Sequence, residues 1–300
     1  MKYGQIEQQR QMYPISLMCR VLVVSESGYH AWRHRPHSER RQLNARLEIE
    51  ILAAHQRTRE TYGAERLHDD LADHGVRTSL HRVRQLRKKL GLCCKQKRKF
   101  KVTTDSKHHL PVAPNLLDRQ FTVTAPNRVW VSDITYIATD EGWLYLAGLK
   151  DLFNGELVGY AMSERMTKSL VMQALFRGVS AKRPAKGLIL HSDRGSQYCA
   201  QDYQKLLKQF GMTASMSRKG DCWDNAPMES FWGSLKNELV HHRQFATREE
   251  AQQEISEYIE VFYAPKEVPL GDNRQRKQAR LGYLSPAAFT QQHFEKMLAA

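Results

Sequence analysis

The sequence predicts an α/β protein in which a basic, all-helical region precedes a mixed sheet with helices packed on it. Three observations lead to this fold class. Lys and Arg outnumber Asp and Glu by 24 to 12 in residues 1–120 but only by 22 to 20 in residues 121–300. Residues 63–91 carry two helical patterns joined by a short turn, whereas residues 128–164 are rich in β-branched and aromatic residues. A basic helical region is typical of polyanion-binding proteins.

The composition is that of a globular protein in a reducing compartment. Of 300 residues, 41% are hydrophobic, and the formal net charge is +14. No run of 18 apolar residues occurs and the first residues are polar, which argues against a membrane-spanning or exported protein. The five cysteines are irregularly spaced, which indicates the cytoplasm. The adjacent pairs Cys93-Cys94 and His108-His109 lack the spacers of a zinc knuckle, so we expect no zinc there.

The basic region is predicted to contain a helix-turn-helix. Residues 14–35 form two short helices, with Ser25 or Ser27 capping the second, and a longer helix follows. In the helix-turn-helix, the first helix ends at Gly75, which suits a left-handed C-cap, and the second begins after Ser79, which suits an N-cap, and ends at Gly91.

Ten Lys and Arg and no acid occupy residues 82–101. Such a run usually covers a solvated helix face, but here it lies on and just after the candidate recognition helix. This position favours contact with DNA phosphates. The predicted DNA-binding residues of this run are Arg82, Arg84, Arg87, Lys88, Lys89, Lys95, Lys97, Arg98 and Lys99.

The second region is predicted to form a mixed sheet with helices packed on it. Three strands form an antiparallel meander, with a two-residue hairpin turn at Asn154-Gly155. Helix, strand, helix, strand and helix follow, which is the order of a ribonuclease-H-like fold. We divide the chain into an N-terminal helical segment (1–40), a helix-turn-helix domain with a basic tail (41–101), a linker (102–120), a ribonuclease-H-like core (121–263) and a C-terminal tail (264–300).

Three acidic residues lie where this fold would bring them together. Asp133 is inside the first strand, Asp193 ends the fourth, and Glu229 begins the helix after the sheet. Because the first and fourth strands of this fold are neighbours, the three carboxylates can meet around divalent cations such as Mg²⁺ or Mn²⁺. Structural alternatives exist: Asp193 can start a turn and Glu229 can favour a helix N-terminus, whereas a strand interior disfavours Asp133.

The segment GDCWDNAPMESFW, residues 220–232, holds two further acids. Asp224 and Asn225 precede Ala226-Pro227, at a predicted first helical turn, and are interpreted as caps. Asp221 lies in a Gly-led loop that we expect to be mobile without DNA, and its role stays unassigned.

Three segments resemble the catalytic blocks of DDE transposases, which are related to retroviral integrases: WVSDITYI (130–137), HSDRGSQY (191–198) and GDCWDNAPMESFWGSLKNEL (220–239). The resemblance is closest to the second-frame product of bacterial insertion sequences of the IS-three family, and it spans nearly the whole chain. It implies a ribonuclease-H-like core, two Mg²⁺ (or Mn²⁺) ions, and catalytic, metal-binding Asp133, Asp193 and Glu229. It also implies a nucleoid-associated bacterial protein.

The family carries a basic residue seven positions after the Glu, and Lys236 matches it. Seven residues bring Lys236 within roughly 20° of Glu229 on the helix, so that Lys236 can hold a DNA strand beside the metals. Another face of the helix is predicted to pack on the sheet through Met228, Phe231, Leu235 and Leu239.

The resemblance also implies a reaction and partners. Water frees a 3′-hydroxyl at the element end, which attacks another phosphodiester; two metals assist both steps. In the family the first transfer joins the two ends, and the circular form is later inserted into target DNA. The implied partners are double-stranded DNA, further copies of the chain, and an upstream-frame product or a frameshift fusion with it. The chain departs from the family at residues 264–272, which are extra, and at Gln278, where His is common.

Two other functions are compatible with parts of the sequence. A non-catalytic DNA-binding regulator would use residues 60–101, but it would leave the three acids unexplained. A structure-specific nuclease on the same fold would cut DNA but not join it.

Overall fold

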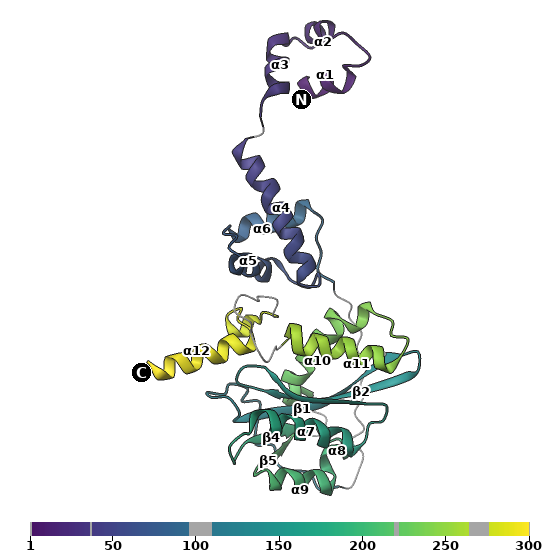
Figure 1. Cartoon of the computed structure of the whole chain (residues 1–300), viewed down its shortest axis with the longest axis vertical. Helices are drawn as coiled ribbons and strands as arrows, with labels where there is room; N and C mark the ends of the chain where they lie inside the picture. Colours follow the sequence, from purple (N-terminus) through teal and green to yellow (C-terminus); the bar gives the residue numbers. More distant parts are fainter. Residues whose placement is uncertain (1, 37, 96–109, 219–221, 264–275, 300) are drawn as a thin grey trace. The chain divides into compact units, whose positions relative to one another are not determined.

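The computed structural model describes residues 2–36, 38–95, 110–218, 222–263 and 276–299 (Figure 1). The chain divides into two compact units, Met1–Glu50 and Ile51–Ala300. Across the described ranges, no helix is both long enough and apolar enough to cross a membrane.

The first unit is helical, as predicted. Its helices α1 (Lys2–Gln9), α2 (Ile15–Val21) and α3 (Glu26–His34) enclose a small core of Ile6, Cys19 and Tyr29. Of the two predicted caps, Ser25 is the one used, since its hydroxyl accepts a hydrogen bond from the Gly28 amide at 3.0 Å. Helix α4 (Glu39–Arg57) follows and ends in the second unit.

The predicted helix-turn-helix is present at the start of the second unit. Helices α5 (Ala64–Asp73) and α6 (Leu80–Lys89) pack through Leu67, Leu71, Val83 and Leu86, all of them buried. Gly75 and Gly91 adopt the left-handed conformation that ends each helix, with φ of 78° and 66°. Ser79 accepts a hydrogen bond from the Arg82 amide at 3.3 Å, which confirms the predicted N-cap.

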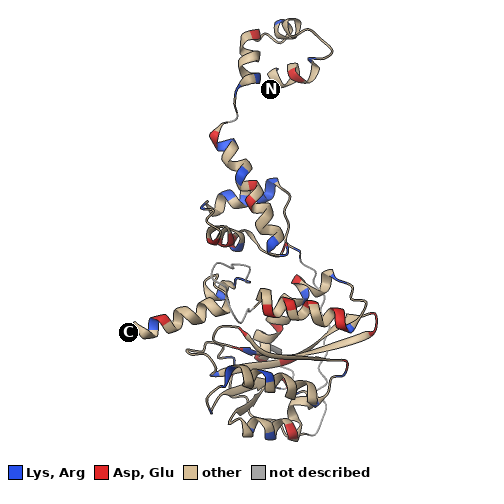
Figure 2. Cartoon of the chain, viewed as in Figure 1, with Lys and Arg blue, Asp and Glu red and all other residues tan. Residues whose placement is uncertain are grey.

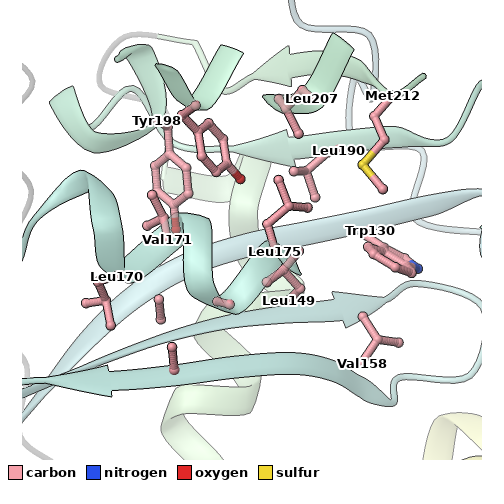
Figure 3. Packing of buried hydrophobic residues seen from close by; sticks show 14 of the residues in the cluster. Trp130, Leu149, Val158, Leu170, Val171, Leu175, Leu190, Tyr198, Leu207 and Met212 are labelled. Atoms are coloured by element: carbon pink, nitrogen blue, oxygen red, sulfur yellow. The ribbon is translucent and has the colours of Figure 1, made fainter. Parts of the chain in front are cut away.

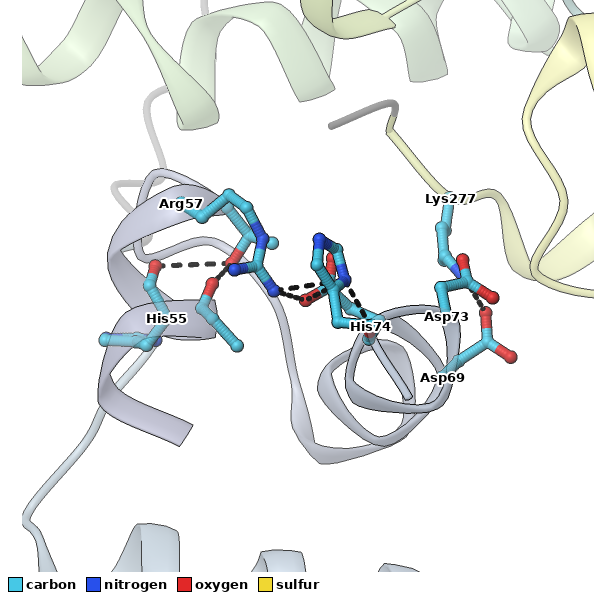
Figure 4. Close-up of polar contacts among 9 residues, drawn as sticks. His55, Arg57, Asp69, Asp73, His74 and Lys277 are labelled. Carbon is cyan, nitrogen blue, oxygen red and sulfur yellow. Dashed lines mark hydrogen bonds and ion pairs between the residues drawn. The ribbon is translucent and has the colours of Figure 1, made fainter. Parts of the chain in front are cut away.

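Polar contacts tie helix α5 to its surroundings (Figure 4). Arg57, from the end of α4, donates to the buried carboxylate of Asp70. On the other side of α5, the buried ammonium of Lys277 pairs with both Asp69 and Asp73. The Lys277 amide also donates to the Tyr62 hydroxyl at 2.6 Å. The described part of the C-terminal tail is therefore anchored on the helix-turn-helix.

The sheet has five strands in the order β3-β2-β1-β4-β5. Strands β1 (Val129–Thr139), β2 (Gly142–Asp151) and β3 (Leu157–Ser163) form the predicted antiparallel meander. Strands β4 (Ile189–Ser192) and β5 (Thr213–Met216) are parallel to β1, so the predicted neighbours, the first and fourth strands, do lie side by side.

The connection between β2 and β3 differs from the predicted two-residue turn at Asn154-Gly155. Strand β2 ends at Asp151 and β3 begins at Leu157, so five residues form the loop. The carboxylate of Asp151 accepts hydrogen bonds from the amides of Asn127 and Phe153, at 2.7 and 2.9 Å. These bonds turn the chain out of the ladder before Asn154, although Gly155 still takes the left-handed conformation with φ of 74°.

Helices cover both faces of the sheet (Figure 1). Helices α7 (Lys168–Lys182), α8 (Ser196–Cys199) and α9 (Gln201–Gln209) cover one face, and Trp130, Leu149 and Leu190 pack against them in the main core (Figure 3). The other face carries α10 (Ala226–Glu238) and α11 (Arg248–Glu257). The remaining elements are the short helices η1 (Cys222–Asn225), η2 (Val240–His242), η3 (Tyr258–Tyr263) and η4 (Ala279–Leu281), and α12 (Pro286–Leu298).

Helix α7 approaches strand β3 unusually closely, because two glycines face each other. A Cβ atom on Gly159 would lie 2.5 Å from the Ala174 carbonyl oxygen and 2.6 Å from the Gly178 nitrogen. Both are backbone atoms, which cannot rotate away. The sequence therefore uses Gly159 to seat α7 on the sheet.

A lysine is buried under α10. Lys150, in β2, donates to the Pro227 carbonyl at 3.0 Å and lies 6.0 Å from the centroid of the Phe231 ring. Burial, with repulsion from Arg280 and Arg276, lowers the pKa of Lys150 to about 7. An unfolded lysine keeps its proton up to about pH 10, so burying Lys150 disfavours folding. This cost is fully present below pH 7 and fades as the pH rises toward 10.

We therefore expect Lys150→Met to stabilise the protein in a pH-dependent way. Near pH 6 the free energy of unfolding should rise by on the order of 3 kcal/mol, because methionine fills the site without a charge to desolvate. Near pH 10 the gain should be close to zero. Urea unfolding of both proteins at the two pH values measures the difference, and an equal gain at both would contradict the assignment.

Candidate active site

Two of the predicted acids lie next to each other because of the strand register. In the parallel pair β1 and β4, Ser132 is level with Ser192. Asp133 is the next residue of β1, and Asp193 directly follows the last residue of β4. Neighbouring strands lie about 4.8 Å apart, and side chains alternate between faces, so both carboxylates belong to the face opposite Ser132. Asp193 also accepts a hydrogen bond from the Gly195 amide at 2.8 Å, which fixes its side chain at the start of the following turn.

The third acid is carried by helix α10. The apolar stripe predicted for this helix is confirmed, since Met228, Phe231, Leu235 and Leu239 are all buried. Glu229 is exposed at the first turn, close enough to act electrostatically on Asp133. Burial, then the nearby charge of Asp193 and more weakly that of Glu229, raises the pKa of Asp133 to about 8. The three predicted acids therefore share one electrostatic environment.

A tryptophan supports the central carboxylate. Trp232 is buried, and its indole N–H donates to Oδ2 of Asp133 at 3.0 Å. Gly148 is the cross-strand partner of Asp133 and makes room for the indole, since a Cβ there would lie 2.9 Å from the Trp232 ring. The sequence alone did not indicate this residue. Its spacing of three from Glu229, which puts both on neighbouring parts of one helix surface, is the signal that could have found it.

We expect Trp232→Phe to lower activity through the position of Asp133. Phenylalanine keeps most of the packing but cannot donate, so the Oδ2 atom loses its fixed partner; such outer hydrogen bonds are typically worth 10- to 100-fold in metal affinity or activity. The measurement is divalent-ion affinity by calorimetry together with the cleavage rate. Unchanged ion affinity and rate in a well-folded variant would show that the bond has no positioning role.

The predicted basic residue of the helix also faces this site. The ammonium of Lys236 lies 4.8 Å from the centroid of the Tyr136 ring, on β1, and the charge of Asp133 acts on it. Burial lowers the pKa of Lys236, while Asp133 opposes this shift. Lys236 therefore shares the electrostatic environment of Asp133.

The histidine of the second motif has a structural role. His191 is fully buried in β4, and its ring nitrogens contact the hydroxyls of Ser215 and Ser217 at 2.9 and 3.2 Å. Burial lowers the pKa of His191 to about 4, so the ring is neutral at neutral pH. The His191 ring therefore links β4 to Ser215 of β5 and to Ser217, which follows β5.

The cap interpretation of Asp224 and Asn225 is wrong. Asp224 is fully buried, and its carboxylate accepts hydrogen bonds from the Asn115 side chain at 3.0 Å and the Arg218 amide at 2.8 Å. Asn225 occupies the N-cap position but donates instead to the Ser132 carbonyl at 3.2 Å. Both side chains are buried beside the sheet. They form hydrogen bonds there with residues distant in sequence, and not with the amides of the helix that follows them. Asp221 lies outside the described residues.

The three acids do not form a closed metal cage. Within the described part of the chain, no three His, Cys, Asp or Glu side chains are gathered into a finished metal cluster. The donor set nevertheless suits hard divalent cations, because the half-buried carboxylate of Asp133, repelled by two others, is relieved by positive charge. An open arrangement leaves ligand positions for water and phosphate oxygens.

Comparison with known proteins places this geometry in a family. Models of the integrase core domain match residues 123–222 and 229–294, and a model of an HTH-like domain matches residues 42–100. Transposase InsF for insertion sequence IS3A of Escherichia coli strain K12 is 40% identical over 291 residues, which cover 96% of this chain and 98% of that protein. The chain belongs to the IS-three family of insertion-sequence transposases.

Other relatives are similar over comparable lengths. The insertion element IS600 uncharacterized 31 kDa protein of Shigella sonnei is 56% identical to this chain over 278 residues, which cover 93% of this chain and 99% of that protein. Among solved structures, the simian T-cell lymphotropic virus intasome in complex with PP2A regulatory subunit B56 gamma aligns over 67% of this chain and 66% of its own, with 15% identity and a TM-score of 0.41.

The predicted DNA-binding residues differ in their exposure and in their contacts. Lys and Arg are frequent on helices α4 to α6 (Figure 2). On α6, Arg84, Lys88 and Lys89 are exposed and Arg82 is half-buried. Arg84 is paired with Glu65 at 3.1 Å, and Arg87 donates to the Cys94 sulfur at 3.5 Å. Lys95 is paired with Glu60 at 3.1 Å. Lys97, Arg98 and Lys99 lie outside the described residues.

Proposed function

We propose that the transposase holds two divalent cations, Mg²⁺ or Mn²⁺, with Asp133, Asp193 and Glu229, and that it cleaves and joins the DNA ends of its insertion sequence there. The observation that carries this proposal is the parallel register of β1 and β4, which puts two carboxylates level on neighbouring strands while α10 adds a third. When bound, such cations activate the attacking oxygen and stabilise the leaving one.

The protein's own groups bind and position the DNA. In the cleavage step, a water oxygen bonds to phosphorus at the element end, the bond to the 3′-oxygen breaks, and that oxygen leaves as a 3′-hydroxyl. In the transfer step, this hydroxyl attacks a second phosphodiester, whose own 3′-oxygen leaves. Lys236 is placed to hold the strand beside the carboxylates, and Trp232 fixes the Oδ2 atom of Asp133. No Ser, Tyr or Cys nucleophile is required.

The helix-turn-helix is proposed to bind duplex DNA of the element ends through α6. The exposed Lys88 and Lys89 lie near its C-terminal end, where they can reach phosphates. We further propose that the transposase acts as a homo-oligomer on DNA, since two ends must be brought together, with an upstream-frame product as partner or fusion.

The experiment that tests the proposed function is a joining assay on linear duplex DNA carrying one element end. We expect cleavage and a joined product with Mg²⁺ or Mn²⁺, and neither with EDTA. Cutting without joining would favour a structure-specific nuclease. Binding that needs no divalent ion, with no cutting under any condition, would favour a non-catalytic regulator.

A further inference from the structure

The first unit, Met1–Glu50, contains a second helix-turn-helix. Helices α2 and α3 are joined by residues 22–25 alone. The amide of Val24 donates to the Cys19 carbonyl at 3.0 Å and that of Val23 to the Arg20 carbonyl at 3.2 Å, which closes the end of α2. Val23 has a φ of 53°, the left-handed conformation that such a turn requires. Ser25 then caps α3, so the chain turns sharply between two helices.

A small core holds α3 against its neighbours. Tyr29, on α3, is fully buried with Ile6 and Cys19, and its hydroxyl donates to the carboxylate of Glu7 on α1. A Cβ on Gly28 would lie 2.4 Å from the Tyr3 hydroxyl oxygen, so α1 and α3 are in close contact. Helix α3 is therefore supported on one side by a defined packing, as a recognition helix must be to present its other side rigidly.

The other side of α3 is polar and exposed. Ser27, Ala31 and His34 are exposed, and His30 is half-buried. Their spacing puts them on one helical face, away from Tyr29. The side chains are short or can donate and accept hydrogen bonds, which is what reading base edges requires.

The charge of this unit suits a polyanion. Residues 1–38 carry five Lys and Arg against two Glu. Glu7 is already engaged, since its carboxylate lies 3.2 Å from the Arg10 side chain and 3.6 Å from that of Arg33. Arg20 at the end of α2 and Arg35 just after α3 are both exposed, on the two elements that flank the turn. A polar, hydrogen-bonding helix face that is flanked by two exposed arginines fits nucleic acid better than an apolar protein partner.

We propose that α3 is a second DNA-recognition helix, which enters the major groove of duplex DNA while Arg20 and Arg35 contact phosphates. Helix α3 belongs to the first unit, whereas α6 and the three carboxylates belong to the second. The transposase would then read two segments of one DNA end, or two ends, with two helix-turn-helix modules of a single chain.

The test uses the full-length protein and a duplex carrying the element's own terminal repeat. The double variant Ser27→Glu/Ala31→Glu puts two negative charges on the exposed face of α3, and Gln8→Glu/Gln11→Glu adds the same charge at exposed positions on and just after α1. The readouts are the dissociation constant and methylation protection of guanine N7, a major-groove atom.

We expect the wild type and the Gln8/Gln11 variant to protect two separate groups of guanines. The α3 variant should lose one group and bind about tenfold more weakly or worse. His34→Glu should lose the same group, which separates recognition from any folding defect of the double variant. Unchanged protection in the α3 variants would overturn the proposal, and so would equal losses in the α3 and control variants. Unchanged protection with a loss of self-association in sedimentation would assign the face to a protein partner instead.

Discussion

Replacing Asp133 or Asp193 by Asn, or Glu229 by Gln, is expected to abolish cleavage and strand transfer while leaving DNA binding intact. Each amide keeps the size of the side chain but removes a negative oxygen ligand. Catalytic groups that act as one unit depend on each other, so that removing one of them costs nearly as much activity as removing all. A single replacement should therefore lower the rate at least about a thousandfold. The measurement is the joining assay on an element-end duplex, with DNA binding followed separately.

The thermal stability of each variant shows whether it has lost activity alone or has also lost its folded structure. Burial and two neighbouring acids raise the pKa of Asp133 to about 8. The unfolded side chain ionises near pH 4, so in the absence of cations Asp133 disfavours folding increasingly as the pH rises from 4 to 8. Asp133→Asn should therefore melt no lower than the wild type at neutral pH without added metal.

Asp140→Asn is the matched control, because it makes the same replacement at an exposed residue that directly follows the last residue of β1. It should retain both activity and stability. Full strand transfer in any of the three active-site variants would remove that residue from the mechanism.

Replacing Gly159 by Ala is expected to have the largest effect on stability. The new methyl group would lie 2.5 Å from the carbonyl oxygen of Ala174 and 2.7 Å from the Cα of Gly178. Because these are backbone atoms of α7, the helix must move away from β3, and the free energy of unfolding should fall by about 3 kcal/mol or more. The core shown in Figure 3 would open along this contact, since Val158 and Leu175 lie in the same cluster.

Gly233→Ala is expected to change the stability in the opposite direction. Gly233 is inside α10, and apart from the neighbouring backbone of that helix no atom lies within 4 Å of the position that a Cβ would take. Alanine there should raise stability by about 0.5–1 kcal/mol, because it restricts the unfolded chain. Denaturant unfolding of both variants measures the contrast. A Gly159→Ala protein as stable as the wild type would mean that α7 is not held at this distance.

The strands were predictable from the sequence because their composition is local information. β-Branched and aromatic runs marked the meander, and the order of elements was enough to make the first and fourth strands neighbours. The level positions of Asp133 and Asp193 depend in addition on the register of that strand pair, in which Ser132 lies opposite Ser192. The loop after Asp151 was not predictable, since it depends on a hydrogen bond from Asn127, which is 24 residues away in the sequence.

The predictions for Glu229 and Asp224 had different outcomes, and the reason is the distance in sequence to their partners. Glu229 was correctly placed on an exposed edge of α10, because helical periodicity fixes which side is buried. Asp224 was wrongly interpreted as a cap, because its partners Asn115 and Arg119 belong to a distant segment. Trp232 was missed for the same reason, since its hydrogen bond to Asp133 crosses from helix to sheet.

The sequence by itself determined the helices and strands and the basic character of the N-terminal region, and it predicted that Asp133, Asp193 and Glu229 form one site. Periodicity, capping residues and charge act over a few residues, so they can be read without coordinates. The tertiary structure alone decided how those carboxylates are held: an indole on Asp133, a glycine opposite it, and a lysine over Tyr136. These contacts join residues that are 15 to 100 positions apart, and only the pairing of β1 with β2 and the packing of α10 on the sheet bring them together.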